Sequence, residues 1–173
     1  MSGTVNSEAA KELYDLRHST AHLMAQAIGE LYPGVKYAIG PPIEDGFYYD
    51  LDLPEPLREE DLPQIEEKMR EIVGRDLPIV REVMPRELAR DFEVSQNQPY
   101  KVELIDDLPA GEEISFYRQG DWIDLCRGPH VPSTGKLKHF KLLHTAELLT
   151  CLSQLLFQLS PLLIRCVEAL VGL

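Results

Sequence analysis

Apolar side chains recur every three or four residues between Ser7 and Leu31, a spacing that predicts one long amphipathic helix. Ser7 is a suitable N-cap, and the Pro33-Gly34 pair ends the pattern. The apolar positions on the predicted face are Leu13, Ala21, Met24, Ala27, Ile28 and Leu31. We therefore expect the fold to begin with a long helix that buries one face.

The rest of the pattern mixes short strands with helices. Strands are predicted at residues 35–39, 46–51, 79–83, 114–117, 122–125 and 137–143. Helices are predicted at residues 59–73 and 86–92, the second of them beginning at Pro85. Residues 100–105 fit either a strand or a helix. Late strands in hairpin-like succession favour an α+β fold, namely a two-layer α/β sandwich with a mostly antiparallel sheet and a long N-terminal helix.

The C-terminal part of the chain differs in character. Residues 148–164 are rich in leucine and contain no charged residue. Such a run is at the lower limit of a membrane-spanning helix, about 17–25 residues. Polar residues and Pro161 interrupt it, so we expect no membrane partner and interpret it as a hydrophobic helix or an aberrant tail. We therefore expect a domain at residues 1–146 and an apolar tail at 147–173.

Composition suits one compact cytoplasmic domain. The chain has 173 residues, of which 44% are hydrophobic, and a formal net charge of −12. An acidic chain is not an obvious nucleic-acid binder, because affinity for phosphates comes mainly from Lys and Arg. Three widely spaced cysteines do not suggest a disulfide framework, and no signal peptide opens the chain.

The charge is nevertheless uneven along the chain. Residues 41–76 hold twelve Asp/Glu against four Lys/Arg, whereas residues 118–145 hold five Lys/Arg against two Asp. We therefore expect any surface that meets a polyanion to come from the second stretch. Its basic residues are Arg118, Arg127, Lys136, Lys138 and Lys141.

Two short motifs carry the candidate chemistry. In His-Ser-Thr-Ala-His, His18 and His22 lie four residues apart, so a helix places them on one face, one turn apart. In Cys-Arg-Gly-Pro-His, Cys126 and His130 have the same spacing at a predicted strand end. Together the four side chains offer a donor set suited to zinc. The alternatives are two histidines at the edge of an amphipathic face, and a buried cysteine beside a loop histidine.

The two motifs together resemble the HxxxH and CxxxH pair of the editing domain shared by threonyl- and alanyl-tRNA synthetases and the free-standing alanyl editing proteins. Further segments resemble the threonyl branch, and the likeness covers roughly residues 12–145. These segments are residues 37–43, 46–50, 100–102, 124–132 and 139–142.

The resemblance implies hydrolysis of the ester that joins serine to the terminal adenosine of mischarged threonine tRNA. A synthetic site rejects the smaller serine poorly, because one missing methyl is worth about 1–3 kcal/mol, and a second site removes the error. The resemblance implies the catalytic residues His18, His22, Lys101, Asp124, Cys126 and His130, and the substrate-binding candidates Tyr48, Tyr49 and Arg127.

The expected roles are specific. His18 and His130 hold or relay protons for the attacking water, and Lys101 stabilises negative charge on the substrate. Asp124 orients a histidine or binds the seryl amine, while Cys126 and His22 shape the pocket. The alternatives are a solvated Lys101 in a strand, a structural pair between Asp124 and Arg127, and tyrosines that belong to the core.

The resemblance leaves zinc open. The alanyl relatives bind zinc through the positions of His18, His22, Cys126 and His130, whereas in the threonyl branch the same residues act on water without a required metal. Cys126 is not expected to be a nucleophile, since no activating base is evident.

The implied partners are the aminoacylated 3′ end of threonine tRNA and a synthetase catalytic core. The chain departs from the family near Ala146, where a Gly-Ala-Tyr-Trp-Arg-Gly-like strand and the class II core are expected, and no ATP site lies in these residues. We interpret the chain as a truncated or frameshifted product, or a free-standing editing protein, with no ligase activity of its own. The competing functions are a non-catalytic tRNA-binding remnant, a structural zinc module and an alanyl-tRNA editing hydrolase.

Overall fold

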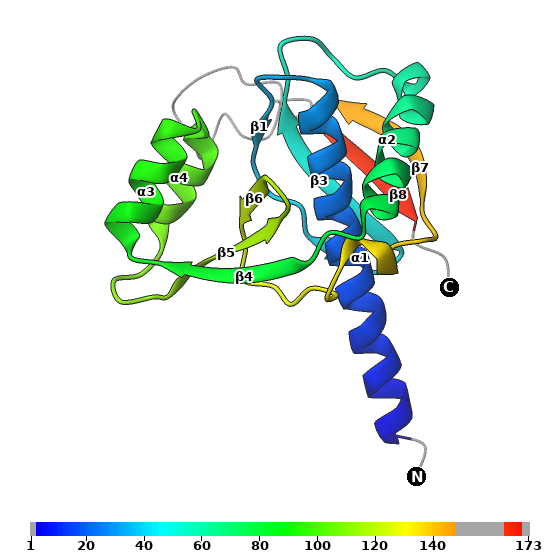
Figure 1. Cartoon of the computed structure of the whole chain (residues 1–173), viewed down its shortest axis with the longest axis horizontal. Helices are drawn as coiled ribbons and strands as arrows, with labels where there is room; N and C mark the ends of the chain where they lie inside the picture. The colour runs from blue at the N-terminus through cyan, green and yellow to red at the C-terminus, as the bar shows by residue number, and fades with distance from the viewer. Residues whose placement is uncertain (1–2, 148–164, 171–173) are drawn as a thin grey trace.

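A computed structural model describes residues 3–147 and 165–170 of the chain (Figure 1). The leucine-rich run at 148–164, with its predicted helix or tail, lies outside the described residues. Among the helices that are described, none is long and apolar enough to cross a membrane.

The expected N-terminal helix is present as α1 (Gly3–Leu31), and it begins earlier than Ser7. Its first turns project away from the rest of the molecule, while its second half enters the body of the fold (Figure 1). Residues 18–28 are buried at every position, not only on the apolar face. The helix therefore carries polar side chains, including His18 and His22, into the interior.

Helix α1 packs beside α2 (Leu62–Arg75) and contacts β3 (Gly46–Asp52). Strand β3 belongs to an antiparallel sheet of order β1-β3-β8-β7, with β2 also paired to β3. The other members are β1 (Lys36–Tyr37), β2 (Pro42–Ile43), β7 (Lys141–Glu147) and β8 (Arg165–Leu170). Strand β8 comes from the segment that the sequence separates as a tail, and it lies between β3 and β7.

A second antiparallel sheet has the order β4-β5-β6. It consists of β4 (Ile79–Met84), β5 (Ile114–Gln119) and β6 (Trp122–Leu125). A tight turn at Gly120, where φ is +65°, joins β5 to β6 and suits a residue without a side chain. The α+β prediction is confirmed, but the strands form two separate sheets where we expected one.

Helices α3 (Arg86–Ser95) and α4 (Pro99–Asp107) form a pair beside the second sheet. Ala89, Ile105 and Phe116 belong to the small apolar core between these helices and β5, whereas the main core surrounds α1. Residues 100–105, which fit either element, are helical, and Pro99 occupies the first turn of their helix. The strand predicted at 137–143 begins only at Lys141, after a 3₁₀ turn at Thr134–Lys136.

Candidate active site

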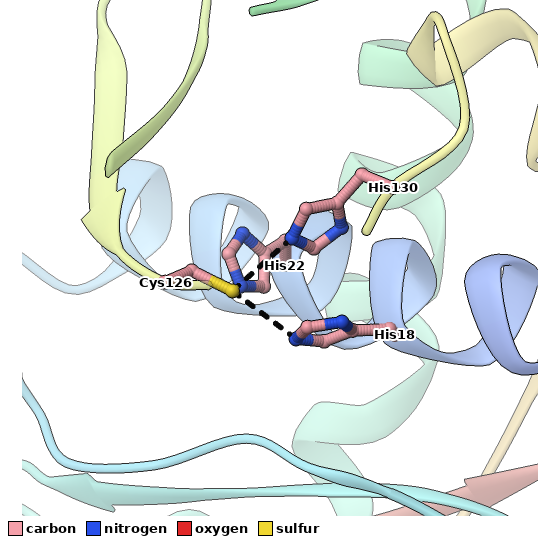
Figure 2. A group of neighbouring side chains, drawn as sticks. All are labelled: His18, His22, Cys126 and His130. Carbon is pink, nitrogen blue, oxygen red and sulfur yellow. Dashed lines mark hydrogen bonds between the residues drawn. The ribbon is translucent and has the colours of Figure 1, made fainter. Parts of the chain in front are cut away.

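Four side chains from the two sequence motifs meet where α1 passes the end of β6 (Figure 2). His18 and His22 come from successive turns of α1, Cys126 directly follows β6, and His130 lies in the loop beyond. The donor atoms of all four lie within 4.8 Å of one another. The ring centroid of His130 lies 4.2 Å from the centroids of both His18 and His22. The structure thus brings together all four residues that the spacing singled out.

The loop after Cys126 folds back because of its Gly-Pro pair. Gly128 has a φ of +75°, and a Cβ at this position would lie 2.1 Å from the Tyr117 hydroxyl oxygen. The backbone N–H of Gly128 donates to Cys126 Sγ over 3.2 Å. The turn therefore returns the chain toward α1, and His130 faces the same sulfur as His18.

Hydrogen bonds fix how the rings lie. Cys126 Sγ is 3.3 Å from His18 Nε2 and 3.3 Å from His130 Nε2. The opposite nitrogens face fixed groups: His18 Nδ1 lies 3.2 Å from the Pro129 carbonyl oxygen, and His130 Nδ1 lies 3.0 Å from Ser19 Oγ. Each of the two rings is thus held at both nitrogens.

Burial keeps this cluster uncharged in the metal-free chain. Desolvation is the main cause that lowers the pKa of His18, and it lowers the pKa of His22 and His130 much further. The neighbouring rings lower the pKa of His22 and His130 as well. Desolvation also raises the pKa of the Cys126 thiol to about 12. At neutral pH the site therefore presents neutral imidazoles and a protonated thiol, so Cys126 is not an activated nucleophile.

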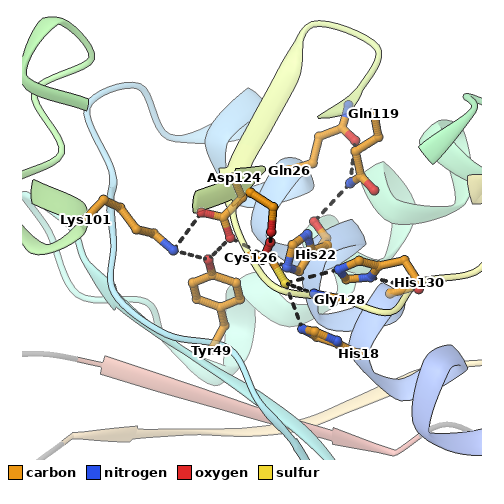
Figure 3. Close-up of polar contacts among 12 residues, drawn as sticks. His18, His22, Gln26, Tyr49, Lys101, Gln119, Asp124, Cys126, Gly128 and His130 are labelled. Carbon is orange, nitrogen blue, oxygen red and sulfur yellow. Dashed lines mark hydrogen bonds and ion pairs between the residues drawn. The ribbon is translucent and has the colours of Figure 1, made fainter. Parts of the chain in front are cut away.

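A second group of polar side chains adjoins the cluster (Figure 3). Lys101 Nζ lies 2.6 Å from Asp124 Oδ1, and their side chains are 3% and 4% exposed. The buried Tyr49 hydroxyl donates to Asp124 Oδ2 and accepts from Lys101 Nζ at 3.2 Å. Asp124 Oδ2 also lies 3.6 Å from His22 Nε2, which connects this group to the histidines.

These contacts bear on three alternatives raised by the sequence. Lys101 is neither in a strand nor solvated, because α4 carries it into the interior. Asp124 pairs with Lys101, whereas Arg127 is largely exposed and pairs with Glu112. Tyr49 belongs both to the core and to the site, since its ring is fully buried while its hydroxyl contacts Asp124.

One open pocket of about 480 Å³, a volume typical of small-ligand sites, is lined by members of both groups, but His130 is not among its lining residues. The lining members are His18, His22 and Cys126 of the cluster, and Tyr49, Lys101 and Asp124 of the second group. Residues 38–42 form one wall, and a Cβ on Gly40 would come within 2.2 Å of the Tyr49 ring. Arg127 lies at the pocket, but Tyr48 does not line it. Successive strand residues face opposite sides of a sheet, so only one tyrosine of β3 can face this pocket.

Three further polar residues support the site and were missed from the sequence. Ser19, between the two histidines, accepts from the Val131 backbone N–H at 2.9 Å as well as contacting His130. Gln119 is fully buried and donates to the His22 carbonyl oxygen at 3.2 Å. Glu93 is 4% exposed, and burial followed by the charge of Asp124 raises its pKa to about 7. Each of the three is a polar residue at a buried position of a helix or strand, and the sequence carries no other signal for them.

The four-residue cluster fits a zinc ion by its chemistry. Three imidazoles and one thiol are the donors that tetrahedral zinc sites use. The buried Nδ1 of His22 has no hydrogen-bond partner among the described residues, and Pro129 O and Ser19 Oγ orient the other two rings as outer partners of a metal site do. His18, His22, Cys126 and His130 are the residues that would hold the ion.

Comparisons with known proteins identify the family of this arrangement. A model of the threonyl and alanyl tRNA synthetase second additional domain matches residues 114–148. A threonine–tRNA ligase from Rubrobacter xylanophilus is 61% identical over 138 residues, which cover 80% of this chain and 21% of that protein. The chain carries a threonyl-tRNA synthetase editing domain.

Similar ligases from Rhodospirillum rubrum and Acetivibrio thermocellus are 60% and 54% identical over 144 and 143 residues. Each match covers 83% of this chain and 22% of the ligase. The chain thus spans about a fifth of the length of the curated relatives it matches. The family predicted from the two motifs is confirmed.

Proposed function

We propose that this domain hydrolyses the ester bond of mischarged seryl-tRNA for threonine. The observation that carries the proposal is the single pocket that joins uncharged histidines to a buried lysine–carboxylate pair. Ester hydrolysis needs a proton acceptor for water and a positive group for the developing oxyanion. The pocket offers both within one small volume. Membership of a tRNA synthetase family supports a tRNA substrate.

Each group has a place in the reaction. Water attacks the ester carbonyl carbon, and the neutral His18 ring, which lines the pocket, accepts the proton that the water loses. Lys101 donates a hydrogen bond to the ester carbonyl oxygen as this oxygen becomes negative. Asp124 and the Tyr49 hydroxyl hold the Lys101 ammonium group in place. The accepted proton then passes to the ribose oxygen as the carbon–oxygen bond breaks, which frees serine and tRNA.

The pocket wall supports discrimination by size. Gly40 packs against the Tyr49 ring with no room for even a Cβ, and Tyr49 is fully buried. A close-packed wall does not yield cheaply to an added methyl group. We propose that this wall admits serine and excludes the additional methyl of threonine, which is the logic of a second sieve.

Three of the five basic residues in the stretch at 118–145 have an acidic partner, which reduces the positive charge available to tRNA, whereas Lys136 and Lys138 are exposed. Arg118 and Lys141 pair with Glu82 and Glu66, and Arg127 pairs with Glu112. We propose that the domain recognises mainly the aminoacylated 3′ end, and that a synthetase core supplies most of the contacts to the tRNA backbone. A weak dependence of deacylation on salt follows, because few phosphates are neutralised.

The test is release of serine from seryl-tRNA for threonine by the full chain. We expect the wild type to release serine and to spare threonyl-tRNA, and we expect His18→Ala and Lys101→Met to slow release by about 10²–10⁴-fold. Lys36→Met is the matched control, since Lys36 is partly exposed and pairs with Asp52 outside the site. It should leave release unchanged.

The same assay separates the alternatives. Binding of tRNA without release of serine would indicate a non-catalytic tRNA-binding module. Faster release from alanyl-tRNA than from seryl-tRNA would indicate an alanyl editing hydrolase. Neither binding nor release, with zinc held at one equivalent, would indicate a structural zinc module.

A further inference from the structure

For uncharged imidazoles and a protonated thiol, the hydrogen bonds around Cys126 have only one consistent direction. His18 Nδ1 faces the carbonyl oxygen of Pro129 at 3.2 Å, and a carbonyl oxygen can only accept. His18 Nδ1 therefore carries a proton. Because the ring is uncharged, its lone pair is on Nε2, which lies 3.3 Å from Cys126 Sγ. The thiol must then donate its single proton to His18.

The direction continues through the sulfur to His130. With its proton given to His18, Cys126 Sγ can only accept from His130 Nε2, which also lies 3.3 Å away (Figure 2). An uncharged His130 that donates from Nε2 has its lone pair on Nδ1. That nitrogen faces Ser19 Oγ at 3.0 Å, so the serine hydroxyl is the donor. In the opposite direction the thiol would donate to His130, and lone pairs of Cys126 Sγ and His18 Nε2 would then face each other.

We propose that Ser19 is a positioning residue whose hydroxyl sets the tautomer of His130, with the proton on Nε2 toward Cys126. The Val131 backbone N–H donates to Ser19 Oγ at 2.9 Å, so the oxygen is anchored and its own proton is directed to the ring. Ser19 is fully buried, so its hydroxyl is shielded from bulk solvent. The Ser19 hydroxyl can also rotate and accept a hydrogen bond from His130 Nδ1. Ser19 therefore still orients the ring when the Nε2 lone pair of His130 binds a proton or a metal ion.

The primary test observes the rings directly. In a long-range ¹H–¹⁵N spectrum of the chelator-treated full chain at neutral pH, His130 should carry its proton on Nε2 and His18 on Nδ1. In Ser19→Ala, His130 Nδ1 loses its donor, so its nitrogen signals should move toward a mixture of tautomers, while Ser19→Thr keeps the hydroxyl and should restore them. Thr20→Ala is the matched control, because the neighbouring Thr20 donates only along the helix, to the Leu16 carbonyl oxygen at 2.7 Å.

The activity arm rests on the proposed function. Ser19→Ala should lower kcat for serine release by about 10–100-fold, the usual effect of losing an outer partner of a functional histidine, with KM unchanged. A wild type that releases no serine would refute the proposed function and leave the ring spectrum to decide the present proposal.

A His130 protonated on Nδ1 in the wild type would overturn the proposal. So would unchanged His130 signals in Ser19→Ala. If Ser19→Ala fails to fold, the wild-type spectrum alone decides, since it fixes the direction of every bond in the chain of contacts.

Discussion

Replacing Asp124 by asparagine keeps the shape of the side chain but removes the charge that faces Lys101. The two charged groups lie 2.6 Å apart with almost no exposed surface. In the variant the ammonium group retains the Tyr49 hydroxyl at 3.2 Å and the nearby carboxyl of Glu93. Because burial raises the pKa of Glu93 to about 7, that carboxyl offers only partial compensation at neutral pH.

The expected cost follows from this geometry. Breaking a buried pair by removing one partner costs about 3–5 kcal/mol, since an uncompensated charge stays buried. With Glu93 as a partial substitute we expect the lower end, about 3 kcal/mol, which for a chain of this size lowers Tm by about 6–12 °C. Adding Lys101→Met removes the stranded charge and should recover part of the loss.

The assay is urea unfolding at pH 7 of the wild type, both single variants and the double variant. Asp52→Asn is the control, because its pair with Lys36 is 3.5 Å long and partly exposed, and should cost less than about 1 kcal/mol. A loss in Asp124→Asn as small as the control would refute the reasoning. So would a double variant that is no more stable than Asp124→Asn alone.

The remaining predictions concern three separate features. Gly40→Ala should displace the Tyr49 ring and abolish serine release, whereas Gly74→Ala, in α2 with open space around it, should stabilise the fold by up to about 1 kcal/mol in urea unfolding. Burial raises the pKa of folded Glu93 from 4.5 to about 7, so the contribution of Glu93 to stability is greatest below pH 4.5 and is lost as pH rises to 7. The free energy of unfolding of Glu93→Gln should therefore gain up to about 3 kcal/mol relative to the wild type across that window. A difference between the two that does not depend on pH would contradict the assignment. With the other two cysteines replaced by serine and metal removed, Cys126 should react with iodoacetamide far more slowly than an exposed thiol, because its pKa is raised to about 12; labelling as fast as free cysteine would be the contrary result.

The parts of the site that follow from local geometry could be predicted from the sequence. A spacing of four on a helix places His18 and His22 one turn apart whatever surrounds them. The Gly-Pro turn after Cys126 likewise returns His130 toward the strand end within a few residues. The long helix and the mixture of antiparallel strands were also readable, because they depend on periodicity and turn residues.

The parts that depend on tertiary packing could not be predicted. Residues 100–105 combine strand-like and helical preferences, and only packing of α4 beside α3 shows that Lys101 points inward. Alternation along β3 requires one of Tyr48 and Tyr49 to face the pocket, but the sequence does not say which. Ser19 was missed because the amphipathic pattern predicts one buried face, whereas α1 is buried on every side at that depth.

The most direct test of the account is where a hydrolysis-resistant substrate analogue binds. Serine joined by an amide to 3′-amino-adenosine should shift the side-chain nitrogen signals of His18, His130 and Lys101 in the full chain, while the threonine analogue at the same concentration should not. Shifts confined to another surface, such as the separate pocket lined by Tyr32 and Pro54, would contradict the account. Equal shifts with serine and threonine would contradict the claim that this pocket selects by size.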